Sequence, residues 1–310
     1  MCCLFGLFDY QGSLSRRQKE RILSALSVAA EERGTDATGI AYNDEGSLKV
    51  FKRCLPAHLL WFRVKDDTKV VMGHTRMATC GDIRQRKNAH PFFGKAGETC
   101  FALAHNGVLS NDRRLRRELQ LPATRIETDS YIAAQILETA SAVNFSALAD
   151  MAQLLEGSFS ITVMTDRDEL FFVKGNNPMA IYHYEKLGLY LYASTESILK
   201  AAIRQMPVKL GRAAKINIDS GEILKIDAEG RITRGQFDDS KLFTSTYSSR
   251  SWGHWFLNEP AWYQTASDES NYLNDLKAVA ACHGIWPEDV DAMLKDGATV
   301  DEIEELIYGC

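Results

Sequence analysis

The chain opens with MCCLFGLFDY, which places a cysteine directly after the initiator methionine. A cysteine thiolate is a strong nucleophile, and removal of Met1 would give Cys2 a free α-amine as well. An α-amine has a pKa of about 7.7–8.0, so it can accept the proton of a neighbouring thiol near neutral pH. Small hydrophobic residues also begin buried strands, so the same run is consistent with packing alone. Cys2 is therefore either a nucleophile that carries its own base or a core residue.

Further polar clusters follow hydrophobic runs, where functional side chains often lie on loops held by a rigid scaffold. They are RGTDATG (33–39), GHTRMATCG (73–81), NAHP (88–91), AHNGVLSN (104–111) and ETDS (127–130). Each is weak by itself, because Asn-Gly is usually a turn and Thr-Asp before a helix is usually an N-cap. His74, His90 and His105 suggest a metal, but no carboxylate or thiol stands at matching spacing, so we interpret them as structural.

The segments between these clusters predict the elements that position them. Residues 15–33 have helical spacing and end at Gly34, whereas residues 38–53 indicate strand, turn and strand. We expect buried strands over 70–79 and 100–109. We expect helices over 127–140 and 145–157, and a later series of strands at 158–166, 169–175, 179–185, 187–194, 213–219, 221–228 and 231–235. Runs of strands with helices segregated between them indicate an α+β fold.

In this order after Cys2, the clusters strongly resemble the class II glutamine amidotransferase domain, an N-terminal-nucleophile hydrolase. The matching blocks are Cys2–Gly6, Arg33–Gly39, Gly73–Thr79, Asn88–Pro91, His105–Gly107 and Thr128–Asp129, and GNNP (175–178) and ASTES (193–197) fit as well. The resemblance covers roughly residues 2–235 and implies a four-layer αββα sandwich.

The resemblance also implies a reaction. Cys2 would attack the side-chain carbonyl of glutamine, form a γ-glutamyl thioester and release ammonia. The Asn106 side chain and the Gly107 backbone N–H would donate hydrogen bonds to the oxyanion of the tetrahedral intermediate. Arg33 and Asp36 are expected to brace the site rather than touch the substrate. No metal or organic cofactor is implied.

Two charged side chains would select the amino-acid end of the substrate. Arg76 resembles the family's clamp on the α-carboxylate, for which a planar bidentate fork is better than lysine. Asp129 resembles the partner of the α-ammonium group. Met77 and Thr79 would line the same loop as Arg76.

The sequence departs from the family pattern at three positions near the site. Cys3 stands where glycine is usual, so its side chain could narrow the pocket floor or merely pack. Met77 stands where synthase-linked members often have an aromatic residue, and Cys80 stands where some have histidine. These loop positions close over glutamine in the synthases, so gating and channel coupling are in question while the hydrolytic residues are all present.

The composition is that of an ordinary globular protein of 310 residues, with 45% hydrophobic and 25% charged residues. Its net charge of −5 gives no nucleic-acid signature, and the basic run 111–121 fits the exposed face of a short helix. No run reaches the ~18 apolar residues of a membrane span, and no signal peptide is visible. Seven cysteines without a CxxC pair favour reduced thiols, so we expect a cytoplasmic protein.

The composition changes near residue 236. Residues 236–267 predict a Ser/Thr-rich linker with an aromatic arm, and residues 268–310 predict a small helical module for interaction or capping. The roughly 75 residues after the first domain are too few for an ammonia-consuming synthase. We therefore expect either a separate ammonia-accepting synthase subunit or a standalone hydrolase.

Two alternative functions stay open at this point. One is hydrolysis of γ-glutamyl peptides or amides without ammonia transfer, which would favour such conjugates over free glutamine. The other is a non-enzymatic glutamine-sensing or scaffold module, which would bind glutamine without turnover.

Overall fold

The computed structural model describes residues 2–242, 277, 285–298 and 302–303. Contacts divide the chain into two units, Met1–Leu242 and Phe243–Cys310. In the second unit, helix α7 (Pro287–Lys295) has proline in its first turn and Gly297 at φ 96° after its end. Most of the predicted linker, the aromatic arm and the other predicted helices of residues 268–310 lie outside the described residues.

The first unit is built on two sheets whose paired strands are antiparallel. The seven-stranded sheet has the order β11-β9-β10-β1-β4-β2-β3, and the six-stranded sheet has the order β13-β12-β8-β7-β6-β5. The strands of the first sheet are β1 (Cys3–Asp9), β2 (Ala37–Asp44), β3 (Ser47–Arg53), β4 (Val70–Arg76), β9 (Ala180–Tyr184), β10 (Leu189–Ala193) and β11 (Ala214–Ile216). Those of the second are β5 (Phe92–Ala96), β6 (Thr99–Leu109), β7 (Gly157–Thr165), β8 (Leu170–Lys174), β12 (Glu222–Ile226) and β13 (Ile232–Gln236).

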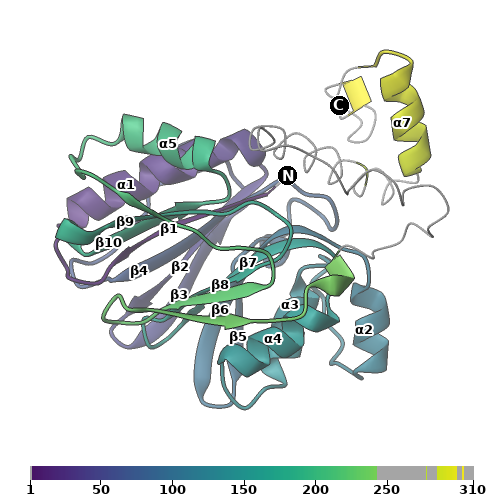
Figure 1. Ribbon diagram of the computed structural model, residues 1–310, viewed down its shortest axis with the longest axis horizontal. Coiled ribbons are helices and arrows are strands. Elements are labelled where there is room, and N and C mark those ends of the chain that lie inside the picture. Colours follow the sequence, from purple (N-terminus) through teal and green to yellow (C-terminus); the bar gives the residue numbers. More distant parts are fainter. Residues whose placement is uncertain (1, 243–276, 278–284, 299–301, 304–310) are drawn as a thin grey trace, which may run out of the picture. The chain divides into compact units, whose positions relative to one another are not determined.

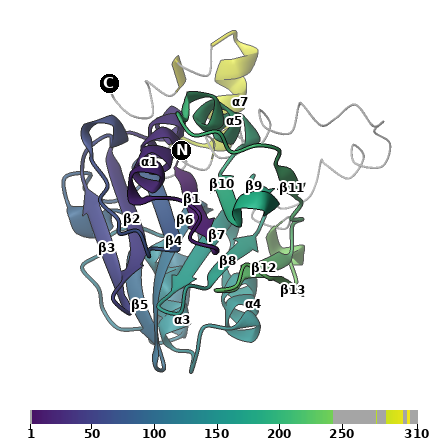
Figure 2. The ribbon, with the colours of Figure 1, turned by 90° about the vertical axis from the view of Figure 1, so that its left-hand side faces the viewer.

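Helices cover the outer face of each sheet, on opposite sides of the unit (Figure 1 and Figure 2). Helices α1 (Arg16–Ala29) and α5 (Glu196–Gln205) pack on the seven-stranded sheet, and α3 (Tyr131–Glu138) and α4 (Phe145–Leu154) pack on the six-stranded sheet. Helix α2 (Asp112–Glu118) lies beside α3. The predicted α+β fold with a four-layer αββα sandwich is confirmed. Among the described residues, no helix combines the length and apolar character that crossing a bilayer requires.

Strand β1 shows how alternation builds the layers. Cys3, Phe5 and Leu7 belong to the core between the seven-stranded sheet and its helices. Leu4 and Phe8 belong to the core between the two sheets. Because successive side chains of a strand point to opposite faces, the residues of β1 are divided between two hydrophobic cores. All of its residues are buried, which explains why its sequence is a continuous apolar run.

The structure confirms most of the predicted elements and adds two. The helix over 15–33 is α1 followed by a 3₁₀ turn, and the turn between β2 and β3 is formed by Glu45 and Gly46, which have φ values of 50° and 73°. Strand β5 and helix α5 were not predicted. Helix α5 has a recognisable signal, because the Thr195 side chain accepts a hydrogen bond from the backbone N–H of Ile198 as an N-cap.

Candidate active site

One end of the sandwich collects the predicted site residues, because strand pairing brings the relevant strand ends together. Strand β1 is antiparallel to β4, with Cys3 opposite Thr75, so the start of β1 lies beside the end of β4. Strand β2 is also antiparallel to β4, with Ala37 opposite Arg76, so the RGTDATG cluster begins at the same end. The register of the strands therefore places these clusters at strand ends, as expected from the sequence.

Alternation aims three of the predicted side chains into the space between the sheets. Their strands contribute to the inter-sheet core through Leu4, Met72 and Ala104. Arg76 and Asn106 each stand an even number of residues from the core residue of the same strand, and Cys2, directly before β1, stands two residues before Leu4, so all three lie on the same faces. The predicted nucleophile, carboxylate clamp and oxyanion donor thus all point into the space between the two sheets.

Cys2 lies immediately before β1 and is partly buried. Its Sγ lies 3.4 Å from the backbone carbonyl oxygen of Met77, to which it donates. Burial raises the pKa of the Cys2 thiol, while the Arg76 charge lowers it. A thiol with a raised pKa is protonated at neutral pH, so its use as a nucleophile requires a base close by.

Asn106 is fully buried near the end of β6. Neither its Nδ2 nor its Oδ1 has a hydrogen-bond partner among the residues that the structure describes. Leaving such a group unpaired costs about 1–3 kcal/mol, so a buried amide in this state indicates a position kept for a ligand. The amide can donate to an oxyanion that forms in the inter-sheet space.

Gly107 follows Asn106 with φ 139°, a conformation that favours glycine. A Cβ atom at this position would lie 2.0 Å from the carbonyl oxygen of Ser158 on the neighbouring strand. Only glycine therefore fits, and the choice is explained by the close approach of β7 as well as by the backbone angle.

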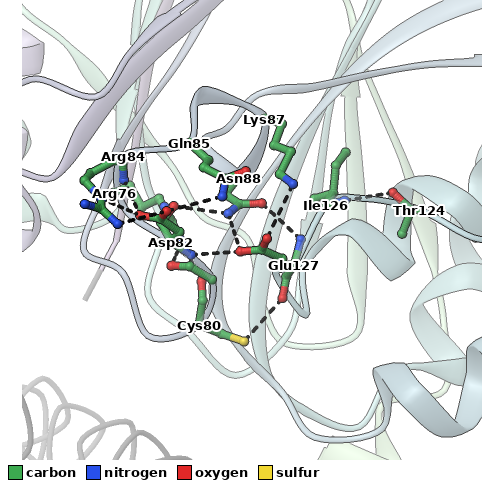
Figure 3. Close-up of polar contacts among 11 residues, drawn as sticks. Arg76, Cys80, Asp82, Arg84, Gln85, Lys87, Asn88, Thr124, Ile126 and Glu127 are labelled. Atoms are coloured by element: carbon green, nitrogen blue, oxygen red, sulfur yellow. Dashed lines mark hydrogen bonds and ion pairs between the residues drawn. The ribbon is translucent and has the colours of Figure 1, made fainter.

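Arg76 is 2% exposed and ends β4. Its Nη2 donates to the carbonyl oxygens of Cys80 at 2.6 Å and Gly81 at 3.4 Å, so the guanidinium folds back on its own loop (Figure 3). Its Nη1 is buried and has no hydrogen-bond partner within the described part of the chain. One edge of the fork is therefore fixed by the loop, and a donor remains for an anionic ligand.

Asp129 lies just before helix α3 but does not cap it. Its Oδ2 accepts a hydrogen bond of 2.6 Å from the backbone N–H of Leu109 at the end of β6. Its Oδ1 accepts one of 3.2 Å from the hydroxyl of Ser130, which is the residue at the N-cap position. The carboxylate is thus held at the end of β6, and its charge raises the pKa of Cys2 in addition to the larger effect of burial.

The segment after Arg76 is held from the side by Asp36. The carboxylate of Asp36 accepts a hydrogen bond of 2.6 Å from the backbone N–H of Ala78, and its own N–H donates to the Arg76 carbonyl at 2.9 Å. This bracing agrees with the expectation for Asp36. Met77 and Thr79 lie on the same segment and are partly buried. Met77 meets Cys2 through its backbone oxygen.

A second bracket was not foreseen from the sequence. It ties the loop after Arg76 to the segment before Asp129 (Figure 3). Glu127 Oε2 accepts hydrogen bonds of 2.9 Å from the backbone N–H of Asp82 and from Nδ2 of the buried Asn88. In return, the backbone N–H of Glu127 donates to Asn88 Oδ1 at 3.0 Å. The presence of Asn88 in NAHP and Glu127 in ETDS was visible in the sequence, but nothing there indicated that they meet.

The three histidines of the motifs are buried in and beside the sheets. His74 Nε2 donates to the carbonyl oxygen of His105 at 3.0 Å, which joins the two sheets. The rings of His74 and His90 are 4.2 Å apart. Burial lowers the pKa of His74 to about 3 and that of His90 well below its usual value, so both are neutral. They act as polar core residues, and among the described residues no group of histidine, cysteine or acidic side chains could hold a metal ion.

Comparisons with known proteins agree with this architecture. Residues 74–201 match a family model described as a glutamine amidotransferase domain. Glutamine–fructose-6-phosphate aminotransferase (isomerizing) from Staphylococcus aureus is 26% identical over 268 residues, which cover 84% of this chain and 43% of the relative. The enzyme of the same name from Staphylococcus epidermidis is 29% identical over 190 residues, covering 58% of this chain and 30% of the relative. The chain thus spans less than half the length of these relatives.

Solved structures support the fold. A glutamine phosphoribosylpyrophosphate amidotransferase from B. subtilis superposes with a TM-score of 0.59 at 20% identity, covering 76% of this chain and 49% of that one. A structure described as the allosteric regulatory enzyme of purine biosynthesis gives a TM-score of 0.62 at 21% identity with the same coverage. The sequence relatives, the family model and the sandwich all point to one group. Residues 74–201 of this chain thus match the glutamine amidotransferase domain family, and the first unit has the sandwich fold of the amidotransferase structures named above.

Proposed function

We propose that this protein hydrolyses the side-chain amide of glutamine through a γ-glutamyl thioester on Cys2. The observation that carries the proposal is the buried Asn106 amide, which has no partner among the described residues and lies on the same inward face as Cys2. An unpaired donor is unfavourable in the resting protein and useful where negative charge develops on an oxygen. The proposal assigns the chemistry to residues 2–235 and the segment 236–267 to a linker.

The acylation step follows from the groups at the start of β1. Loss of Met1 would expose the α-amine of Cys2, and that amine would accept the thiol proton as the sulfur attacks the amide carbonyl. The carbonyl oxygen would gain negative charge and accept hydrogen bonds from Asn106 Nδ2 and the Gly107 N–H. Collapse of this intermediate would break the C–N bond, return the proton to the leaving nitrogen and release ammonia.

Substrate selection would depend on two charges. The unpaired Nη1 of Arg76 supports binding of an α-carboxylate, and Asp129 supports binding of an α-ammonium group. A substrate with both groups is a free amino acid or a γ-glutamyl compound with an unmodified α-carbon. Met77 and Thr79, on the loop that follows Arg76, would contact the same end of the substrate.

Water would then hydrolyse the thioester to glutamate. We further propose that the ammonia passes to an acceptor enzyme on a separate chain, since the relatives that match this domain are named as aminotransferases of a sugar phosphate and are more than twice the matched length. Hydrolysis of γ-glutamyl conjugates without ammonia transfer is the alternative outcome of a substrate screen. Binding of glutamine without turnover would instead support a sensing role.

The test is glutamine hydrolysis by the Met1-processed protein, with Cys2→Ala and Cys3→Ala compared. Processing is verified by intact mass. We expect Cys2→Ala to abolish glutamate release and Cys3→Ala to retain it. Loss of activity in Cys3→Ala but not in Cys2→Ala would overturn the assignment of the nucleophile.

A further inference from the structure

We propose that Asn177, in the GNNP turn after β8, is a positioning residue that sets the direction of the Gly107 N–H in the oxyanion site. The inference rests on the proposed function, because it concerns the same oxyanion. It gives a role to a turn that the mechanism above does not use.

The direct contact is a hydrogen bond to the peptide that joins Asn106 to Gly107. Asn177 is 2% exposed, and its Nδ2 donates to the Asn106 carbonyl oxygen at 2.9 Å. The C=O of Asn106 and the N–H of Gly107 belong to the same planar unit and point in opposite directions. A donor fixed on the oxygen therefore fixes the direction of the N–H on the other side of the plane.

The turn is itself anchored to the strand opposite Gly107. Phe159 of β7 is the register partner of Gly107. Its N–H donates to Asn176 Oδ1 at 3.1 Å, and its carbonyl oxygen accepts from the Asn177 N–H at 3.3 Å. The hydroxyl of Ser160 donates to the Asn177 carbonyl at 2.6 Å. Phe159 thus directs these backbone groups to the turn, and the turn has a fixed position relative to β6.

Close packing makes the arrangement specific. A Cβ atom on Gly107 would lie 2.8 Å from Asn177 Nδ2. The amide of Asn177 therefore rests directly against the glycine backbone. Hydrogen bonds in a chain polarise one another, so donation to the Asn106 carbonyl also strengthens the Gly107 N–H as a donor. Asn177 would act on the oxyanion through this peptide, without touching the substrate.

Two neighbouring asparagines allow a matched test. Asn177→Asp removes the Nδ2 donor and keeps the shape of the side chain. Asn176→Asp makes the same chemical change in the same turn, but Asn176 uses its oxygen as an acceptor, which aspartate retains. Asn177→Ala removes the donor without adding a charge. Each variant is assayed for kcat and KM with glutamine, and Cys2 alkylation by iodoacetamide is measured because that reaction requires no oxyanion site.

We expect both Asn177 variants to lower kcat by about 10- to 100-fold, with KM and the Cys2 alkylation rate changed by less than about threefold. Asn176→Asp should stay within about threefold of the wild-type kcat, since its acceptor is preserved. Equal kcat values for wild type, Asn177→Ala and Asn177→Asp would overturn the inference while leaving the proposed function intact. Parallel losses of kcat and alkylation would also overturn it, because they would indicate general disruption. A wild-type protein that hydrolyses no glutamine would overturn the proposed function, and the inference with it.

Discussion

At the scale of single residues, the two adjacent cysteines have different surroundings because a strand alternates. Cys3 belongs to the core under α1 and is fully buried, whereas Cys2 stands on the face that looks toward the other sheet. The sequence left open whether Cys3 narrows the pocket floor or packs. Its position in the core between the seven-stranded sheet and its helices indicates that it packs. A cysteine in place of the family's glycine therefore adds volume away from the predicted substrate.

Changing Cys3 should therefore affect stability rather than catalysis. We expect Cys3→Gly to lower the free energy of unfolding by about 1–2 kcal/mol, because it empties a core position and places glycine inside a strand. The kcat/KM for glutamine should stay within about threefold. Denaturant unfolding and glutamate release, measured on the same preparations, check both parts. A changed KM with unchanged stability would contradict this placement of Cys3.

At the scale of elements, the loop after β4 links the two charged groups that are predicted to bind the amino-acid end of the substrate. Cys80 and Gly81 accept hydrogen bonds from Arg76, and Glu127 holds the next residue, Asp82. The position of the loop therefore determines the direction of the guanidinium. Asp129, two residues beyond Glu127, carries the negative charge of the site, opposite to the positive charge of Arg76. The bracket thereby connects the groups predicted to bind the α-carboxylate and the α-ammonium.

Removing the Glu127 carboxylate should loosen this loop. We expect Glu127→Ala to raise KM for glutamine by about three- to tenfold with a smaller effect on kcat, because the reacting atoms are not touched. Glu127→Gln keeps one acceptor oxygen and should fall between. The control is Glu98→Ala, which removes an exposed glutamate that forms an ion pair with the exposed Lys95. Steady-state kinetics with an unchanged KM for Glu127→Ala would refute the bracket's role.

The motifs and most helices and strands could be identified from the sequence because both are local signals. Which strands pair, and which motifs meet in space, could not be predicted from it. Cys2, Arg76 and Asn106 were identified by motif, while their common inward direction follows from register and sheet stacking. Strand β5 was missed because its sequence, FFGKA, has an exposed phenylalanine, Phe93, and a glycine at its centre, so apolar and polar residues do not alternate along it. The Glu127 bracket was missed because it joins residues about 40 positions apart whose side chains have no distinctive spacing.

At the scale of the whole molecule, buried neutral histidines join the two sheets. His74 and His90 have pKa values lowered by burial, and so has His105, where the Asp129 charge opposes the effect. An unfolded histidine has a pKa of about 6.5. Below that pH the unfolded chain binds more protons than the folded one, so stability is fully present above about pH 6.5 and is lost as the pH falls.

Acid should therefore destabilise the protein before its carboxylates titrate. For His74 alone, the loss approaches about 1.4 kcal/mol per pH unit between the unfolded pKa and the folded value of about 3. The loss is checked by measuring the free energy of unfolding with denaturant at about pH 7.5, 6.5, 5.5 and 5, with His74→Gln as the comparison. The slope should be smaller in the variant. A wild-type stability that stays constant from about pH 6.5 to 5 would be incompatible with neutral buried histidines.

The central claim is that Cys2 is the nucleophile and that its own α-amine is the base. The most direct measurement is acid-quench mass spectrometry of the protein during turnover of glutamine, followed by mapping of the modified peptide. We predict a γ-glutamyl adduct on Cys2 that is absent from Cys2→Ala and from protein in which Met1 is retained. An adduct on Cys3, or equal acylation of the Met1-retaining protein, would contradict the claim.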